Sequence, residues 1–231
     1  MSRRIARRFA AEFAGTALLV GLGSGTIVAA GRVGGIPQWT MALAWFLAVL
    51  APVVLFVGES GAHLNPAVTL ALAVSGRTAW RTAPGYWAAQ ISGAFLASLV
   101  VLGTLGNANR LGATVPTSGD LALAFSVEAS FTALLVAAVF ALADRGEGRA
   151  RWRLLLPPGA VGLATYVIGP LTGSSLNPAR TLAPAVLSGT YTDLWLYLTA
   201  VPLAATLLAL VWRPRAVDIA DRGPGRLTAA P

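Results

Sequence analysis

Two copies of one short motif, Asn-Pro-Ala, carry the residues of this chain best suited to hydrogen-bond a small molecule. Asparagine is a favoured N-cap and proline suits the first helical position, so each copy predicts a helix start. A capping asparagine accepts a backbone N–H with its amide oxygen and still has an NH₂ group to donate to a passing oxygen. The six residues are Asn65, Pro66, Ala67, Asn177, Pro178 and Ala179.

Three other groups are ionisable or polar within apolar sequence. Glu12 and Glu128 are intramembrane carboxylates, which are costly unless they are paired or hydrogen-bonded. They indicate either a proton relay or structural acceptors for half-helix backbone N–H groups, and their symmetric placement favours the acceptors. His63 is the only histidine. A hydrolase would pair it with Ser60, Ser174 or Ser175, but no second element of such a site is present, so we expect no enzyme and a hydrogen-bonding role for His63.

The composition is that of an integral membrane protein. The 231 residues are 56% hydrophobic and 11% charged, with a mean hydropathy of +0.70, too apolar for an ordinary soluble domain. Six stretches approach the about 20 residues of a spanning helix; they are residues 9–30, 38–58, 83–105, 121–143, 154–171 and 194–212. The first is too long for a signal peptide and lacks a cleavage site, so we expect it to remain as a helix.

The two Asn-Pro-Ala segments are too short to cross a membrane. Each runs for only about a dozen residues before a glycine, Gly76 or Gly189, a length that indicates a re-entrant segment. Two such pieces end to end, at ~1.5 Å per residue, match one hydrocarbon core of ~30 Å. We therefore expect two half-helices whose N-termini meet at mid-membrane.

The chain is a duplication. The sequence from Glu12 to Val20 resembles that from Glu128 to Val136, and the two Asn-Pro-Ala segments share their flanking residues. Each half holds three spans, an odd number, so the second half must be inverted, which places the site at the midplane. The sequence thus predicts an all-α membrane protein with six transmembrane helices and two re-entrant half-helices in an inverted repeat. Small residues at helical spacing predict close helix packing; they are Gly21, Gly25, Ala89, Gly93 and Ala97.

All 17 basic residues are arginines, and all except Arg32, Arg110 and Arg180 lie on one side of the predicted spans. The positive-inside rule then places both termini in the cytoplasm, as expected for a plasma (inner) membrane protein. A nucleic-acid-binding protein would show a basic face on a soluble domain, and none is visible. The chain has no cysteine, which excludes disulfides and cysteine-ligated metals; we expect no metal or other cofactor.

These motifs together resemble the major intrinsic protein (aquaporin) family. The similarity rests on the paired Asn-Pro-Ala motifs, the Ser-Gly-Ala-His-Leu before the first, Arg180 after the second and the Glu-x-x-x-Thr of each half, and it covers residues 8–212. It implies a passive pore for water and small uncharged solutes, one per subunit of a homotetramer. It also implies an outer constriction, or selectivity filter, formed by Trp45, Thr165, Ser174 and Arg180.

This filter differs from two common patterns of the family. Water-selective members usually have His at the position of Thr165 and Phe at that of Trp45, and bacterial glycerol facilitators usually have Asp where this chain has Thr181. Trp with small residues and Arg is more similar to the plant nodulin-like members, as is Tyr197-Leu198. The resemblance therefore implies glycerol-like polyols as solutes, with urea or neutral metalloid acids as further candidates.

The predicted organisation is a single channel domain. Residues 1–8 form a cytoplasmic N-terminus, residues 9–213 the channel with repeats at 9–105 and 121–213, and residues 214–231 a disordered cytoplasmic tail. The expected partners are water, small neutral solutes, membrane lipid and further copies of the chain. The alternative is an inverted-repeat secondary transporter coupled through Glu12 and Glu128.

Overall fold

The structure, a computed structural model, describes residues 3–117, 119–144 and 151–212. Within them six helical segments are long and apolar enough to cross a membrane. The long helices are α1 (Arg3–Arg32), α2 (Gln38–Phe56), α4 (Ala83–Leu105), α5 (Leu121–Ala143), α6 (Leu156–Thr172) and α8 (Leu194–Val211). Two short helices, α3 (Pro66–Val74) and α7 (Pro178–Ser188), follow the Asn-Pro-Ala asparagines. The predicted all-α class, with six spans and two half-helices, is confirmed.

Short 3₁₀ segments precede or connect some of these helices. They are η1 (Trp80–Thr82), η2 (Ala108–Gly112) and η3 (Arg151–Leu155). The connection after α4 contains η2. The segment η3 extends the short α6 to a length that can span a membrane. The predicted disordered tail at 214–231 lies outside the described residues.

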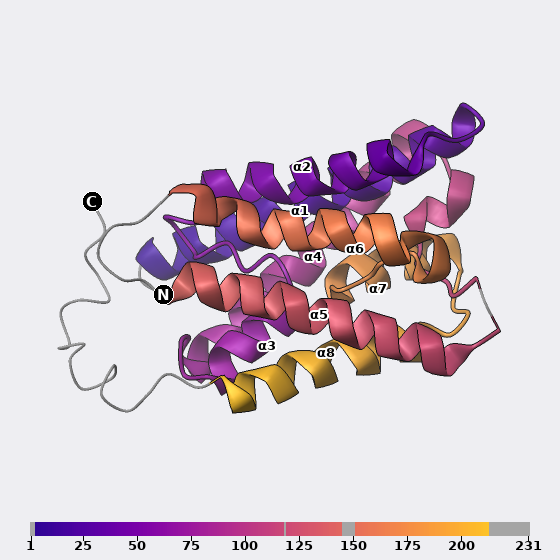
Figure 1. Ribbon diagram of the computed structural model, residues 1–231. Helices are drawn as coiled ribbons and strands as arrows, with labels where there is room; N and C mark the ends of the chain where they lie inside the picture. The colour runs from indigo at the N-terminus through magenta and orange to yellow at the C-terminus, as the bar shows by residue number, and fades with distance from the viewer. Residues whose placement is uncertain (1–2, 118, 145–150, 213–231) are drawn as a thin grey trace, which may run out of the picture.

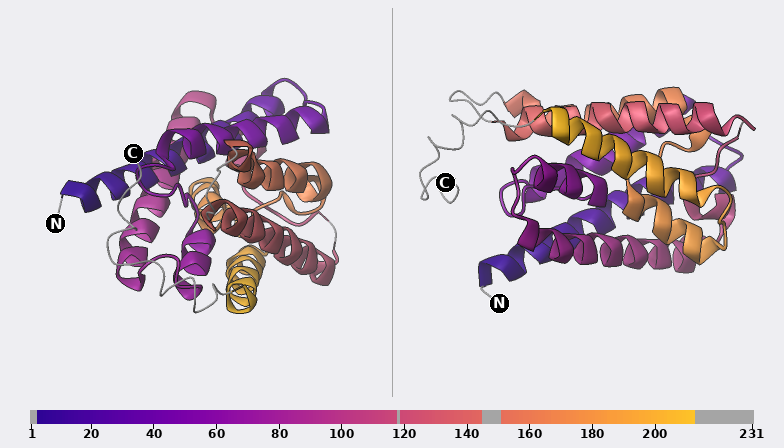
Figure 2. Two further views of the ribbon diagram at one scale, coloured as in Figure 1. Left: turned by 60° about the vertical axis from the view of Figure 1, so that its left-hand side comes forward. Right: turned by 90° about the horizontal axis from the view of Figure 1, so that it is seen from below.

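The two repeats form one bundle. In the first, α1 packs against α2 and α4; in the second, α5 packs against α6 and α8; α2 on α6 joins them. Figure 1 shows the start of α1 and the end of α8 at the same end of the bundle, as an even number of spans requires. In Figure 1 and the right-hand view of Figure 2, α3 lies toward that end and α7 toward the other.

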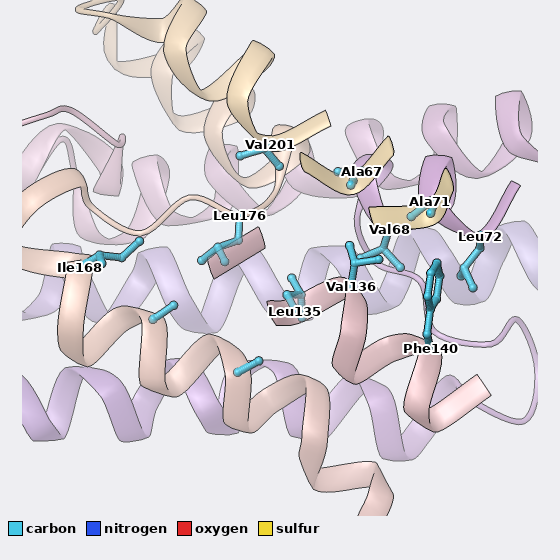
Figure 3. Packing of buried hydrophobic residues seen from close by; sticks show 14 residues of the cluster. Ala67, Val68, Ala71, Leu72, Leu135, Val136, Phe140, Ile168, Leu176 and Val201 are labelled. Carbon is cyan, nitrogen blue, oxygen red and sulfur yellow. The ribbon is translucent and has the colours of Figure 1, made fainter. Parts of the chain in front are cut away.

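Each half-helix is held by the other repeat. The first-repeat helix α3 packs on α5 and α8, and the second-repeat helix α7 packs on α4. Figure 3 shows the buried side chains of α3 against those of α5 and α8; they include Val68, Leu72, Leu135, Val136, Phe140 and Val201. Because each half-helix is buried in the opposite repeat, packing of the two repeats fixes where the two half-helix N-termini lie.

Helices α1 and α4 are in tight backbone contact at Gly93. A Cβ there would lie 2.3 Å from the carbonyl oxygen of Phe13, a backbone atom that cannot move aside. At Gly21 and Gly25, the pair expected to mark close packing, a Cβ would lie 3.7 and 3.6 Å from its nearest neighbours, which is ordinary contact. Of the predicted small residues, Gly93 is therefore the one with no space for a side chain.

Candidate functional site

Asn65 and Asn177 cap the two half-helices and also join the two repeats. Each amide oxygen accepts the backbone N–H two residues later, at 2.9 and 3.0 Å respectively, which confirms the predicted caps. The amide nitrogen of Asn65 donates to the carbonyl of Leu176 at 2.7 Å, and that of Asn177 to the carbonyl of Leu64 at 2.9 Å. An NH₂ group has two hydrogens, so each asparagine has one N–H beyond this cross-repeat bond.

The backbone before each half-helix follows the same uncommon course. Three residues in each copy have left-handed angles, with φ between 48° and 89°. They are Gly61, Ala62, Leu64, Gly173, Ser174 and Leu176. Four of the six are not glycine. Each such residue costs about 1–3 kcal/mol and keeps this conformation only because surrounding contacts hold it. In both loops this course presents a leucine carbonyl to the asparagine of the other repeat.

Glu12 holds the first of these loops. Its carboxylate accepts the backbone N–H groups of His63 and Leu64 at 2.9 and 2.7 Å. It also accepts the Ser60 hydroxyl at 2.6 Å and the Gln90 side-chain amide at 2.7 Å. Glu12 is fully buried, so these four donors offset the burial of a charge.

Glu128 holds the second loop in the same way. It accepts the N–H groups of Ser175 and Leu176 at 2.9 and 3.2 Å and the Thr172 hydroxyl at 2.6 Å. Both glutamates are therefore acceptors, but for the loop that precedes each half-helix rather than for the half-helix itself, which corrects the expectation. The reason is that these backbone N–H groups belong to the strained loop, where no helical carbonyl can accept them.

Arg180 and Trp45 lie against one another at the start of α7. The guanidinium carbon is 4.7 Å from the centroid of the indole ring. One terminal guanidinium nitrogen, Nη1, donates to the carbonyl of Gly112 at 2.6 Å, and the second, Nη2, donates to that of Gly173 at 3.4 Å. Arg180 is 1% exposed, and its Nε has no hydrogen-bond partner among the described residues. A buried N–H of this kind needs an acceptor, which a water or a solute oxygen can supply.

The two other predicted filter residues are also buried. Thr165 and Ser174 are each 4% exposed. The Ser174 hydroxyl has no partner within the described part of the chain, whereas the backbone carbonyl of Thr165 accepts from Gln38. Neither side chain lines the cavity that contains Trp45 and Arg180. The structure thus brings two of the four predicted filter residues to one cavity.

That cavity has a volume of about 50 Å³, several times the roughly 10–15 Å³ that one water molecule requires. Its polar lining comes from the two strained loops and the half-helix starts: His63, Asn65, Ser175, Asn177 and Arg180. Its apolar lining comes mainly from the spans: Leu19, Trp45, Val49, Val53, Leu135, Val139 and Val161. A molecule inside therefore meets hydrogen-bonding groups from the half-helix regions and apolar side chains from the long helices.

His63 lies at this cavity and is not paired with a serine. Its Nδ1 hydrogen-bonds the Thr69 hydroxyl at 3.1 Å, and its ring packs edge-on against Tyr86 at 4.7 Å between centroids. The Ser60 hydroxyl donates instead to Glu12. None of the three serines considered as its partner, Ser60, Ser174 or Ser175, hydrogen-bonds His63 in the described part of the chain.

Two tyrosines, Tyr86 and Tyr197, support the loops, a role that the sequence did not predict for either of them. Tyr86 donates to the carbonyl of Ser60 at 2.7 Å, and Tyr197 donates to that of Thr172 at 2.6 Å. Both hydroxyls thus secure the start of a strained loop. The two tyrosines are 111 positions apart, close to the spacing of the asparagines, so the repeat itself was the signal that could have found them.

Comparison with known proteins agrees with this architecture. Residues 1–212 match the family described as Major intrinsic protein. The chain is 34% identical to aquaporin NIP1-3 of Oryza sativa subsp. japonica, over 96% of this chain and 77% of that protein. It is 38% identical to glycerol uptake facilitator protein-like 6 of Lactiplantibacillus plantarum, over 90% of this chain and 97% of that protein.

A solved structure extends the likeness to three dimensions. The aquaglyceroporin from Plasmodium falciparum superposes with a TM-score of 0.80 at 27% sequence identity, covering 95% of this chain and 100% of that chain. The structural match extends over both repeats. The family match over residues 1–212 extends over both capping asparagines and Arg180. The chain therefore belongs to the major intrinsic protein family.

Proposed function

We propose that this protein is a passive channel for water and small uncharged solutes such as glycerol, and that it excludes protons and ions. The observation that carries the proposal is a cavity of about 50 Å³ lined by both capping asparagines and by Arg180. The names of the relatives, an aquaporin and a glycerol uptake facilitator, indicate the same two solutes. Urea and neutral metalloid acids are further candidates of similar size.

Selection against cations follows from the half-helix starts. The N-terminus of a helix carries a partial positive charge, and α3 and α7 bring two of them together through Asn65 and Asn177. The buried Arg180 adds a full positive charge to the same cavity. A neutral molecule can accept the free N–H groups with its oxygen, whereas a cation or hydronium is repelled.

We propose that Trp45 and Arg180, with Thr165 and Ser174, form the constriction that selects by size. The indole offers a flat apolar face, and the Nε of Arg180 and the hydroxyl of Ser174 are buried polar groups without a protein partner. A slim polyol has carbon–hydrogen bonds along one edge and hydroxyls along the other. It can therefore contact both kinds of surface at once.

Coupled transport through Glu12 and Glu128 is not favoured. Neither carboxylate lines the cavity, and each accepts three or more hydrogen bonds from the loop and its neighbours. A proton carrier must exchange with the pathway. Members of this family are passive channels rather than enzymes or pumps, so the hydrolase alternative is set aside as well.

We further propose a homotetramer in the plasma (inner) membrane, with both chain termini cytoplasmic. The arginine distribution supports the orientation, and the many exposed leucines and valines of the long helices, among them Leu47, Leu99, Leu163 and Leu207, suit lipid or a neighbouring subunit. One channel domain over residues 9–213 accounts for both repeats.

Stopped-flow light scattering on proteoliposomes tests the channel. Vesicles with the protein should shrink and then re-swell under a glycerol gradient faster than empty vesicles, and should shrink faster in sucrose. Arg180→Val should let protons leak, measured with an entrapped pH dye, because the cavity loses its full charge while the helix dipoles remain. Proteoliposomes no more permeable than empty vesicles to both water and glycerol would refute the proposal.

A further inference from the structure

Two loops hold the guanidinium of Arg180. Gly112, in the connection after α4, and Gly173, in the loop before α7, each supply a backbone carbonyl. The direction of the guanidinium therefore depends on how these two loops sit relative to one another and to the first turn of α7.

Thr114 contacts all three segments. It follows Gly112 by two residues and is 3% exposed. Its hydroxyl hydrogen-bonds the Thr181 hydroxyl at 3.2 Å, and Thr181 is the residue after Arg180. Its backbone lies against Gly173, where a Cβ would be 3.1 Å from the Cα of Thr114. Thr114 thus contacts both loops whose carbonyls accept from Arg180, and also the helix that carries the arginine.

The hydroxyl contact continues toward the asparagines. Thr181 also hydrogen-bonds the Ser175 hydroxyl, which accepts the backbone N–H of Asn177 at 3.3 Å. Thr181 is fully buried and Ser175 is 5% exposed. Three buried hydroxyls, from Thr114, Thr181 and Ser175, therefore link the segment after α4 to the cap of the second half-helix.

We propose that Thr114 is a positioning residue for Arg180: its hydrogen bond to Thr181 and its packing on Gly173 keep the Gly112 and Gly173 carbonyls at the distance that fixes the guanidinium beside Trp45. The inference rests on the proposed channel function, because its effect is read as solute selectivity. Loss of the Thr114 hydroxyl loosens the loops, lets the guanidinium withdraw and widens the opening.

The test compares Thr114→Val with Thr117→Val in proteoliposomes. Valine keeps the size of threonine and removes the hydroxyl. Thr117 lies in the same connection. Its hydroxyl donates to the carbonyls of Pro170 and Leu171 at 2.8 and 3.1 Å, neither of which is an acceptor of Arg180. Thr114→Val should raise the ratio of glycerol to water permeability about fivefold, which corresponds to one buried hydrogen bond of about 1 kcal/mol. Thr117→Val should leave the ratio unchanged, and Thr114→Ser should restore it.

A second variant covers the case in which Thr114→Val does not fold. Thr181→Val removes the same hydrogen bond from the other side, together with the bond between Thr181 and Ser175, so it should raise the ratio at least as much. The double variant should show a ratio no higher than that of Thr181→Val alone. A folded Thr114→Val or Thr181→Val protein whose ratio equals or falls below the wild-type ratio would overturn the inference.

A readout without transport separates this inference from the proposed function. The Nε–H resonance of Arg180 in an NMR spectrum, assigned by its loss in Arg180→Lys, reports where the guanidinium lies even if the wild type conducts neither solute. It should shift or broaden in Thr114→Val and remain in place in Thr117→Val. An unmoved resonance in Thr114→Val would also contradict the positioning role.

Discussion

The indole of Trp45 lies between the guanidinium of Arg180 and a glycine of α1. The guanidinium carbon is 4.7 Å from the ring centroid, and a Cβ built at Gly23 would be 2.6 Å from two atoms of the same ring. Gly23 therefore decides how far the indole can withdraw from the cavity, although it does not line the cavity itself.

Gly23→Ala should narrow the channel. The added methyl group has no space unless the indole moves, and because Trp45 lines the cavity, movement away from Gly23 reduces the opening. We expect glycerol permeability to fall more than water permeability, with a cost in stability of about 1–3 kcal/mol from overpacking. Stopped-flow scattering gives both permeabilities from one preparation.

Gly25→Ala, two positions on, is the matched control. A Cβ there meets Val101 at 3.6 Å, an ordinary contact, so both permeabilities and the melting temperature should stay near wild type. Equal ratios in Gly23→Ala and Gly25→Ala would show that Trp45 does not limit solute size.

Thr165→His tests the remaining part of the filter. An imidazole is larger than the threonine side chain and adds a donor, so it should lower glycerol permeability more than water permeability. We expect the ratio of glycerol to water permeability to fall about tenfold, equivalent to roughly 1.4 kcal/mol of barrier. Thr165→Val, similar in size and without a donor, should change the ratio little. If Thr165→His leaves the ratio at its wild-type value, Thr165 does not belong to the constriction.

The main features of this fold could be predicted from the lengths of the apolar stretches and from the internal duplication. Apolar stretches of span length gave the six long helices, and the Asn-Pro-Ala motifs gave the starts of α3 and α7. The inversion of the second repeat could be predicted because each repeat has an odd number of spans. The capping role of Asn65 and Asn177 followed from residue type alone.

The contacts that position Arg180 could not be predicted. The Gly112 carbonyl belongs to a connection whose glycines and asparagines indicate turns but not the direction of any carbonyl. Likewise, the donors to Glu12 lie in a loop with left-handed backbone at non-glycine residues, which propensity disfavours. Tertiary contacts determine both arrangements, and a single sequence does not state them.

Glu12→Gln and Glu128→Gln should reduce stability and leave the solute ratio unchanged. A glutamine side chain has an NH₂ where the carboxylate had an acceptor, so at least one backbone N–H loses its bond, at a cost of about 1–3 kcal/mol. Glu12 has four donors and Glu128 three, so we expect the larger loss for Glu12. Thermal unfolding in detergent measures the loss.

The control is Glu59→Gln, which makes the same substitution at an exposed carboxylate. Glu59 pairs with Arg7, and both side chains are well exposed, so its loss should cost less than about 1 kcal/mol. Folded Glu12→Gln protein that loses only proton-dependent flux would support coupled transport instead.

Arg77 joins the end of the first half-helix to the second repeat. It lies three residues after α3, and its guanidinium makes two bonds to the carboxylate of Asp144 at 2.8 and 2.6 Å and one to the carbonyl of Trp212 at 3.0 Å. It also lies over the Phe140 ring, 3.9 Å from the centroid. The ends of α5 and α8 therefore meet at one side chain, which is 4% exposed.

Arg77→Lys should destabilise the protein although it keeps the charge. An ammonium cannot reproduce the two parallel bonds to a carboxylate or the stacking on a ring, so we expect a loss of about 1–3 kcal/mol. Arg81→Lys, at an exposed arginine four residues later, should change the melting temperature little. Because the contact lies away from Arg180, glycerol and water permeabilities of the folded Arg77→Lys protein should keep their wild-type ratio. Melting temperatures that are equal in the two lysine variants would show that the fork at Arg77 does not hold the repeats together.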